Sequence, residues 1–204
     1  MYSTMARLII QNVNMIQMDT SSHEHYCNNV DKFPIDKFLQ RGTGRGKKLL
    51  IVGESPAPNG WRKSGKACYT PEGKLLPTGI RLNELLKPYL LSVANCGFTE
   101  LAKCHVGKDR KLLLSCSRKC WPIFIKQTDL VNSELILLLG IKTLEVFNKI
   151  SGNTLQVGEI DKVKLGRNNF LILPIYHPSP INPHGKRKNQ SIFRHNNCVL
   201  QNTI

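Results

Sequence analysis

Residues 49–52 form an apolar run, Leu-Leu-Ile-Val, that stops abruptly at Gly53, Glu54, Ser55 and Pro56. An apolar run bounded by turn residues is typical of a strand that is buried on both faces of a sheet. In open α/β sheets, ligands bind in the crevice beside the carboxyl ends of such strands. The loop that begins at Gly53 is therefore the first candidate for a functional site.

Strands and helices alternate along the rest of the chain. Further predicted strands cover residues 97–104, 134–140 and 171–176. The spacing of apolar residues predicts helices at residues 33–39, 80–90, 115–131 and 143–150. This alternation indicates an α/β fold, in which a doubly wound, mostly parallel sheet is covered by helices on both faces.

The charge balance indicates a polyanionic partner. The chain has 29 basic and 14 acidic residues, a net charge of +15, which would repel itself without such a partner. DNA or another nucleic acid is the first candidate, and an anionic membrane surface is the second. No apolar run approaches the roughly 20 residues of a membrane-spanning helix, so we expect a soluble, cytoplasmic protein. Seven cysteines without a secretion signal favour reduced thiols or metal ligands over disulfides.

A second polar loop, His177-Pro178-Ser179-Pro180, follows the last predicted strand. Because the carboxyl ends of parallel strands meet at one edge of a sheet, this loop should face residues 53–56. The pair of loops resembles the uracil-DNA glycosylase superfamily. Further blocks resemble its iron-sulfur branch, families four and five, in order and spacing: residues 62–66, 69–73, 99–104, 120–122 and 135–140.

The resemblance implies a three-layer α/β/α fold with a central, mostly parallel, four-stranded sheet. Residues 47–204 would form the glycosylase domain, and residues 1–46 would form an N-terminal segment that carries candidate metal ligands. The implied activity is that of a monofunctional DNA glycosylase, which flips a nucleotide into a pocket and hydrolyses its N-glycosidic bond to leave an abasic site.

The resemblance also assigns roles to individual residues. Tyr69 occupies the place of the family's base-stacking Phe, and Gly53 and Ser55 complete the base-binding loop. His177 would donate to a base oxygen and stabilise the departing anion, while a carboxylate orients water and offsets the positive charge on the sugar. Two side chains compete for the carboxylate role, Glu54 and Glu72; we favour Glu54, and the alternative for either is that it caps the following turn.

DNA contacts are expected from the two loops and the basic residues near them. Ile181 would fill the gap left by the flipped nucleotide, although it could be only a surface apolar residue. Backbone phosphates supply most sequence-independent affinity. The expected phosphate contacts are Ser179, Arg62, Lys63, Lys66, Lys186, Arg187 and Lys188; the alternative for the charged residues is a solvated face.

Glu100 departs from the family pattern, which has Asn before the Lys-Cys pair. An ionised carboxylate only accepts hydrogen bonds, so it would repel the carbonyl at position four of uracil and accept from the amino group of cytosine. We therefore hypothesise that the enzyme reads a cytosine-type base, such as a modified cytosine of phage DNA, in anti-phage defence. The alternative is that Glu100 points away from the base and a neighbouring residue reads it. The enzyme would then be a uracil-DNA glycosylase of base-excision repair.

The cysteines only partly match the ligand set of the iron-sulfur branch, which holds a [4Fe-4S] cluster. Cys104 and Cys120 match the two later ligands, and Cys27 matches one of the first pair. The partner of Cys27 is missing because residue 30 is Val. His25 is the leading candidate for a fourth ligand, with His23 and Cys116 as alternatives. Without a cluster these cysteines would be buried structural thiols.

Two other classes of function remain open. The chain could be a catalytically inactive DNA-binding module of the same fold, although it keeps Glu54, Tyr69 and His177 together. It could instead act on free nucleotides, although a small substrate gives no reason for a charge of +15. We expect a monomer that acts on DNA.

Overall fold

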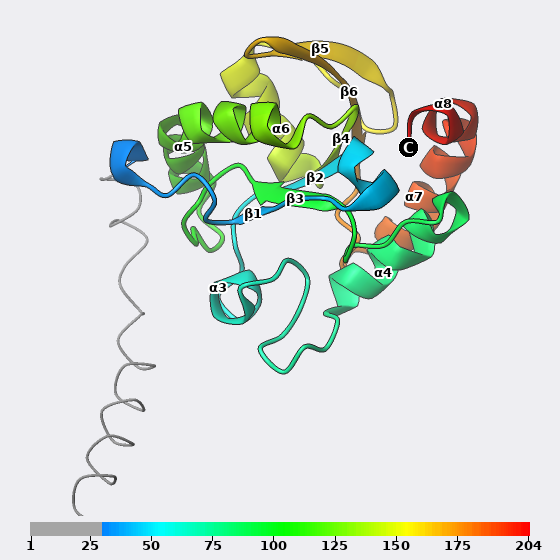
Figure 1. Ribbon diagram of the computed structural model, residues 1–204, viewed down its shortest axis with the longest axis horizontal. Coiled ribbons are helices and arrows are strands. Elements are labelled where there is room, and N and C mark those ends of the chain that lie inside the picture. Colours follow the sequence, from blue (N-terminus) through cyan, green and yellow to red (C-terminus); the bar gives the residue numbers. More distant parts are fainter. Residues whose placement is uncertain (1–29) are drawn as a thin grey trace, which may run out of the picture.

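The computed structural model describes residues 30–204, which form one six-stranded sheet with helices on both faces (Figure 1). The strands are β1 (Leu39–Gln40), β2 (Leu49–Gly53), β3 (Gly97–Glu100), β4 (Leu135–Leu139), β5 (Asp161–Leu165) and β6 (Asn168–Ile175). The α-helices are α3 (Trp61–Ser64), α4 (Pro77–Leu86), α5 (Arg110–Val131), α6 (Ile141–Ser151), α7 (Gly185–His195) and α8 (Asn197–Thr203). Three short 3-10 helices are η1 (Val30–Lys32), η2 (Gly44–Lys48) and η3 (Lys87–Tyr89).

The four central strands, β3-β2-β4-β6, are all parallel, as the sequence predicts. The predicted total of four strands is wrong, because β1 and β5 add antiparallel strands at the two edges. β5 has a single buried face, so charged and apolar residues alternate in it instead of forming an apolar run. β1 lies within the segment 1–46 and consists of two residues paired with β3.

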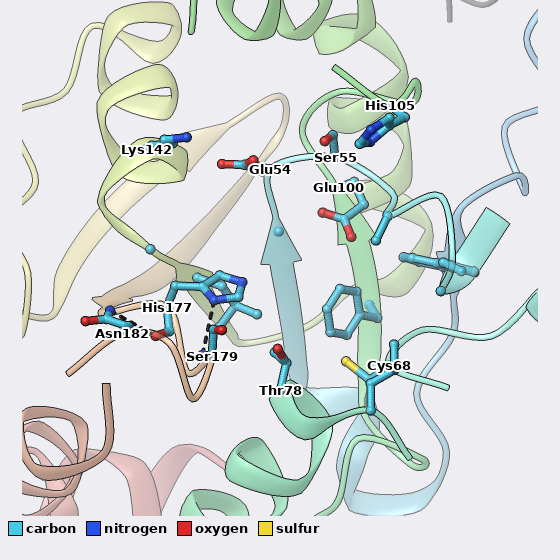
Figure 2. Close-up of a pocket in the computed structure, with 18 of the residues that line it drawn as sticks. Glu54, Ser55, Cys68, Thr78, Glu100, His105, Lys142, His177, Ser179 and Asn182 are labelled. Atoms are coloured by element: carbon cyan, nitrogen blue, oxygen red, sulfur yellow. Dashed lines mark hydrogen bonds between the residues drawn. The ribbon is translucent and has the colours of Figure 1, made fainter. Parts of the chain in front are cut away.

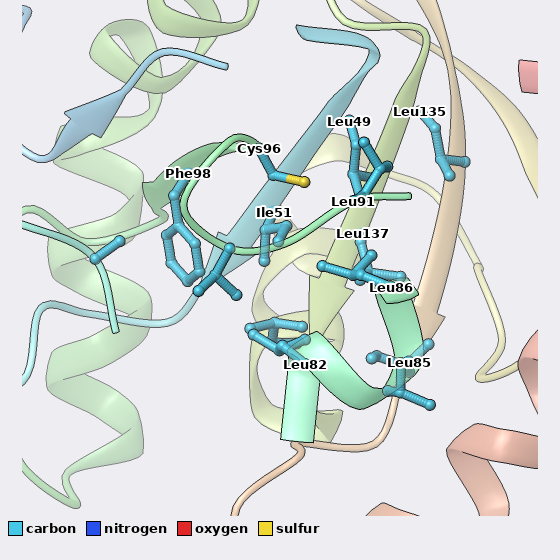
Figure 3. Close-up of a cluster of buried hydrophobic side chains, with 14 of the residues drawn as sticks. Leu49, Ile51, Leu82, Leu85, Leu86, Leu91, Cys96, Phe98, Leu135 and Leu137 are labelled. Atoms are coloured by element: carbon cyan, nitrogen blue, oxygen red, sulfur yellow. The ribbon is translucent and has the colours of Figure 1, made fainter. Parts of the chain in front are cut away.

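Alternate residues of β2 point into two separate cores, which explains its continuous apolar run. Leu49 and Ile51 pack on one face, which α4, α7 and α8 cover (Figure 3). Leu50 and Val52 pack on the other face, beneath α5 and α6. Buried apolar surface stabilises a fold by about 25 cal/mol per Å², and β2 buries such surface on both faces. β2 is therefore the central support of the site.

Two predicted elements differ from the observed ones. The helix predicted at residues 33–39 is a turn, closed by the Lys37 amide donating to the Pro34 carbonyl at 2.9 Å, and it brings Phe38 against Trp61. The strand predicted at residues 97–104 ends at Glu100. There the chain bends over the end of β2, where the Leu101 amide donates to the Gly53 carbonyl at 2.9 Å.

The three longer predicted helices exist with shifted ends. α5 begins at Arg110, five residues before the predicted start, because Asp109 caps it by accepting from the Lys111 and Leu112 amides at 2.8 and 2.9 Å. The C-terminal helices α7 and α8 were not predicted. No helix within residues 30–204 is long and apolar enough to cross a lipid bilayer.

Candidate active site

The carboxyl ends of β2, β3, β4 and β6 open onto one cavity of about 730 Å³ (Figure 2). Seven residues singled out from the sequence line it: Gly53, Glu54, Ser55, Glu100, His177, Ser179 and Ile181. The two polar loops, which lie more than 120 residues apart in the chain, therefore face each other as predicted. The topology of the parallel sheet produces this meeting, because all four strands end at the same edge.

Glu54 is held at the wall of the cavity by its own backbone. Its carbonyl accepts from the Ala102 amide at 2.9 Å, so the loop after β2 is fixed to the segment after β3. Figure 2 shows the carboxylate of Glu54 and the ammonium group of Lys142 pointing toward each other. A carboxylate in this position can orient a water molecule beside a cationic sugar.

Glu100 ends β3 and is buried in the wall of the same cavity. Among residues 30–204 its buried Oε2 atom has no hydrogen-bond partner, and it occupies the space beside Gly53, where any Cβ atom would overlap with it. Burial raises the pKa of Glu100 from 4.5 to about 8, an effect that Lys103 opposes and Glu54 reinforces. The carboxyl group is therefore largely protonated at neutral pH.

Lys103 is the buried cation nearest to Glu100, and its three donors go elsewhere. The ammonium group donates to the Thr99 hydroxyl at 2.8 Å, to the Gln127 side-chain carbonyl at 2.6 Å and to the backbone carbonyl of Glu100. Desolvation lowers the pKa of Lys103 to about 7. Because these bonds use the backbone oxygen of Glu100, the carboxyl group stays available to a ligand.

His177 is oriented by the loop that follows it. Its Nδ1 atom accepts a hydrogen bond from the Ser179 amide at 3.2 Å, so the neutral ring carries its proton on Nε2. Desolvation lowers the pKa of His177, which keeps the ring neutral although its open side contacts solvent. The ring therefore offers an Nε2–H donor to the cavity that it lines (Figure 2).

Two residues that the sequence analysis gives catalytic or base-binding roles lie outside the cavity wall. Glu72 is exposed on the turn in which the Gly73 amide donates to the Thr70 carbonyl, and the Thr70 hydroxyl lowers its pKa. The ammonium group of Lys66 lies over the ring of Tyr69, 4.1 Å from the ring centre. The aromatic rings that do line the cavity are Phe98 and Trp61, packed edge to face at 5.4 Å.

The comparison with protein families agrees with this geometry. The model of the uracil DNA glycosylase superfamily matches residues 41–201, which include both loops and all four parallel strands. The chain belongs to the uracil DNA glycosylase superfamily. A search of the curated proteins finds no match to this chain. Superfamily membership indicates DNA glycosylase activity, which hydrolyses an N-glycosidic bond, and DNA as the partner.

The basic residues expected to contact DNA lie on both sides of the cavity. Ile181 is 93% exposed at its rim. Lys186, Arg187 and Lys188 form the exposed first turn of α7, directly after the His177 loop. Lys63 and Lys66 are exposed and Arg62 is half-buried around α3, on the side of the other loop. Both sides of the cavity therefore carry positive charge.

The proposed ligands of an iron-sulfur cluster are only partly described. Cys104 and Cys120 are buried, and the Lys103 amide donates to the sulfur of Cys120 at 3.4 Å, so the two segments are adjacent. Burial raises the pKa of Cys120, which favours the thiol form. Cys27 and His25 lie outside the described residues, and residues 30–204 contain no group of three or more side chains that could hold a metal ion.

Sequence reasoning missed several residues that line the cavity. Lys142 follows the carboxyl end of β4, and Asn182 donates from its side chain to the His177 carbonyl at 3.1 Å. Phe98, Trp61, Thr78 and His105 also line the cavity. The rule that identified Glu54 and His177, a polar residue just after a parallel strand, would also have identified Lys142.

Proposed function

We propose that this protein is a monofunctional DNA glycosylase that releases a flipped, cytosine-type base, such as a modified cytosine of phage DNA. The observation that supports this choice of base is the buried carboxyl group of Glu100 in the cavity wall. The carbonyl oxygen of this carboxyl group can accept a hydrogen bond from the exocyclic amino group of cytosine, which uracil lacks.

The reaction follows from the positions of Glu54 and His177 around the base. In the transition state, positive charge develops on the sugar and negative charge on the departing base. The Nε2–H group of His177 would donate to a base oxygen and stabilise that negative charge. Glu54 would accept a proton from the water molecule that attacks C1′. Its negative charge would also offset the positive charge on the sugar.

A ring in the cavity is needed to hold the flipped base. Phe98 is placed to stack on it, since it lies in the cavity wall next to Trp61 and two residues before Glu100. Tyr69 would then contribute to the shape of the loop instead of contacting the base. Ile181, at the rim, would occupy the gap in the duplex.

Uracil is the second candidate substrate. Membership of the uracil DNA glycosylase superfamily favours it, and a protonated Glu100 can pair with it, because a carboxylic acid both donates and accepts. A role in base-excision repair would then replace the role in defence.

A [4Fe-4S] cluster is retained in the proposal as a structural element. It would be held by Cys104 and Cys120 together with Cys27 and His25, and it would fasten the N-terminal segment to the domain. Neither Glu54 nor His177 depends on it for the chemistry described above.

Base release from matched duplexes tests the proposal. The duplexes carry uracil, cytosine, 5-hydroxymethylcytosine or glucosylated 5-hydroxymethylcytosine, and alkali reveals abasic sites. We expect release of a cytosine-type base, strands that stay intact without alkali, and a loss of roughly 100-fold or more in His177→Ala. Release of uracil alone would support repair, and binding without release of any base would support an inactive module.

A further inference from the structure

Cytosine is harder to release than uracil, because its departing anion is less stable. Protonation at N3 removes this difficulty, since the base then leaves as a neutral molecule. A glycosylase for cytosine-type bases therefore needs an acid at the N3 and N4 edge of the bound base, beyond the groups that serve uracil.

Glu100 has the geometry of such an acid. In the part of the chain that the structure describes, its Oε2 atom is buried without a hydrogen-bond partner against the backbone of Gly53, a place that favours a neutral group over a charged one. The nearest cation is Lys103, and its ammonium group donates its three hydrogen bonds to Thr99, to Gln127 and to the backbone carbonyl of Glu100. The carboxyl group is thus left without a cationic partner, although it lines the cavity.

The other titratable groups around Glu100 do not remove its proton. Glu54, which follows β2, disfavours a second negative charge, and the thiol of Cys68 has its pKa raised to about 12 by burial and by Glu100. His177 and His105 line the same cavity, and desolvation keeps His177 neutral. Lys142 also lines the cavity, and Lys103 is the cation that opposes the effect of burial on the pKa of Glu100.

We propose that Glu100 is a catalytic acid that protonates N3 of a cytosine-type base while its carbonyl accepts from the exocyclic amino group. This inference rests on the proposed glycosylase function and adds the step that makes cytosine a leaving group. As the proton moves from Glu100 to N3, the bond between N1 and C1′ breaks and its electron pair stays with the base, which leaves neutral.

Water supplies the hydroxyl group that the sugar gains. Water adds to C1′ and transfers a proton to Glu54, which leaves an abasic sugar and a carboxylate at Glu100. Solvent then returns the proton from Glu54 to Glu100 after the base departs. The substrate class is a base with a ring nitrogen acceptor beside an amino group, and uracil needs no such proton.

Glu100→Gln is the matched variant, because an amide keeps one donor and one acceptor but has no proton to transfer. Single-turnover release is measured for uracil and for the preferred cytosine-type base between about pH 6 and about pH 10. We expect the variant to lose about 100-fold or more with the cytosine-type base and clearly less with uracil, because Gln can still pair with uracil but has no proton to transfer. Thermal melting checks that the variant folds.

The wild type should release the cytosine-type base about tenfold more slowly for each pH unit above the pKa of Glu100, near 8. Difference infrared spectra should show the carbonyl band of a protonated carboxyl group that Glu100→Gln lacks. A variant that releases the cytosine-type base at the wild-type rate overturns the inference and leaves the glycosylase intact. A wild type that releases no base at any pH overturns both.

Discussion

Gly53 and Glu100 are paired residues at the ends of two parallel strands, and the carboxyl group of Glu100 fills the space that a side chain at residue 53 would need. The Oε2 atom of Glu100 is buried there and has no hydrogen-bond partner among residues 30–204. Glycine at residue 53 is thus a condition for the position and the protonation state of Glu100, and not only a turn residue after β2.

Gly53→Ala should therefore displace Glu100. We expect base release to fall by about 100-fold and the free energy of unfolding to fall by about 1 kcal/mol, the low end for overpacked cores, because the displaced group is the flexible end of a side chain that borders the cavity. Glu100→Asp in the same chain shortens the opposing side chain and should restore most of the stability. A double-mutant cycle measured by denaturant unfolding tests this coupling, and additive effects would contradict it.

Glu54 and Glu72 should behave differently when each is replaced by Gln. Glu54 lines the cavity and Glu72 is exposed on a turn outside it. We expect Glu54→Gln to lower the single-turnover rate by about 100- to 1,000-fold, and Glu72→Gln to leave it within about twofold. Both variants should melt near the wild-type temperature. A slow Glu72→Gln enzyme beside a fast Glu54→Gln enzyme would reverse the assignment.

The pattern of apolar and turn residues along the sequence predicts those parts of the fold that depend mainly on neighbouring residues. The buried central strands and the Gly and Pro stops after two of them, and hence Glu54 and His177, could be found that way. Glu100 was singled out only through the family resemblance, because the strand predicted at residues 97–104 runs past it. β1 could not, because two residues become a strand only by pairing with β3. That Tyr69 lies outside the cavity wall could not be predicted, because tertiary contacts fix the path of its loop, such as the Leu76 amide donating to the Cys68 carbonyl.

Ile181 should matter for duplex DNA and little for single strands. Its side chain is 93% exposed at the rim of the cavity, so truncation removes almost no packing. We expect Ile181→Ala to slow base release from duplexes by about 10-fold or more, since unstacking costs a few kcal/mol, and to leave the melting temperature unchanged. Single-stranded substrates provide the control, and equal slowing on both would show that Ile181 contacts the base itself.

The stability of the protein should depend on pH through Glu100. Its pKa is raised from 4.5 in the unfolded chain to about 8, so the folded state holds a proton that the unfolded state has lost. The resulting stability is complete below pH 4.5 and is lost as the pH rises toward about 8. Urea unfolding of the wild type and Glu100→Gln at several pH values isolates this effect. A difference between them that stays constant with pH would mean that Glu100 is ionised in the fold.

Iron content should depend on the N-terminal segment. Within residues 30–204, no group of three or more side chains could hold a metal ion, so Cys104 and Cys120 cannot complete a cluster there. We expect the anaerobically purified wild type to contain iron with absorbance near about 400 nm, and the double variant His25→Ala/Cys27→Ala to lose both signals. Cys198→Ser, an exposed thiol on α8, is the control and should keep them. Iron retained by the double variant would place the ligands elsewhere, and a wild type without iron would remove the cluster from the proposal.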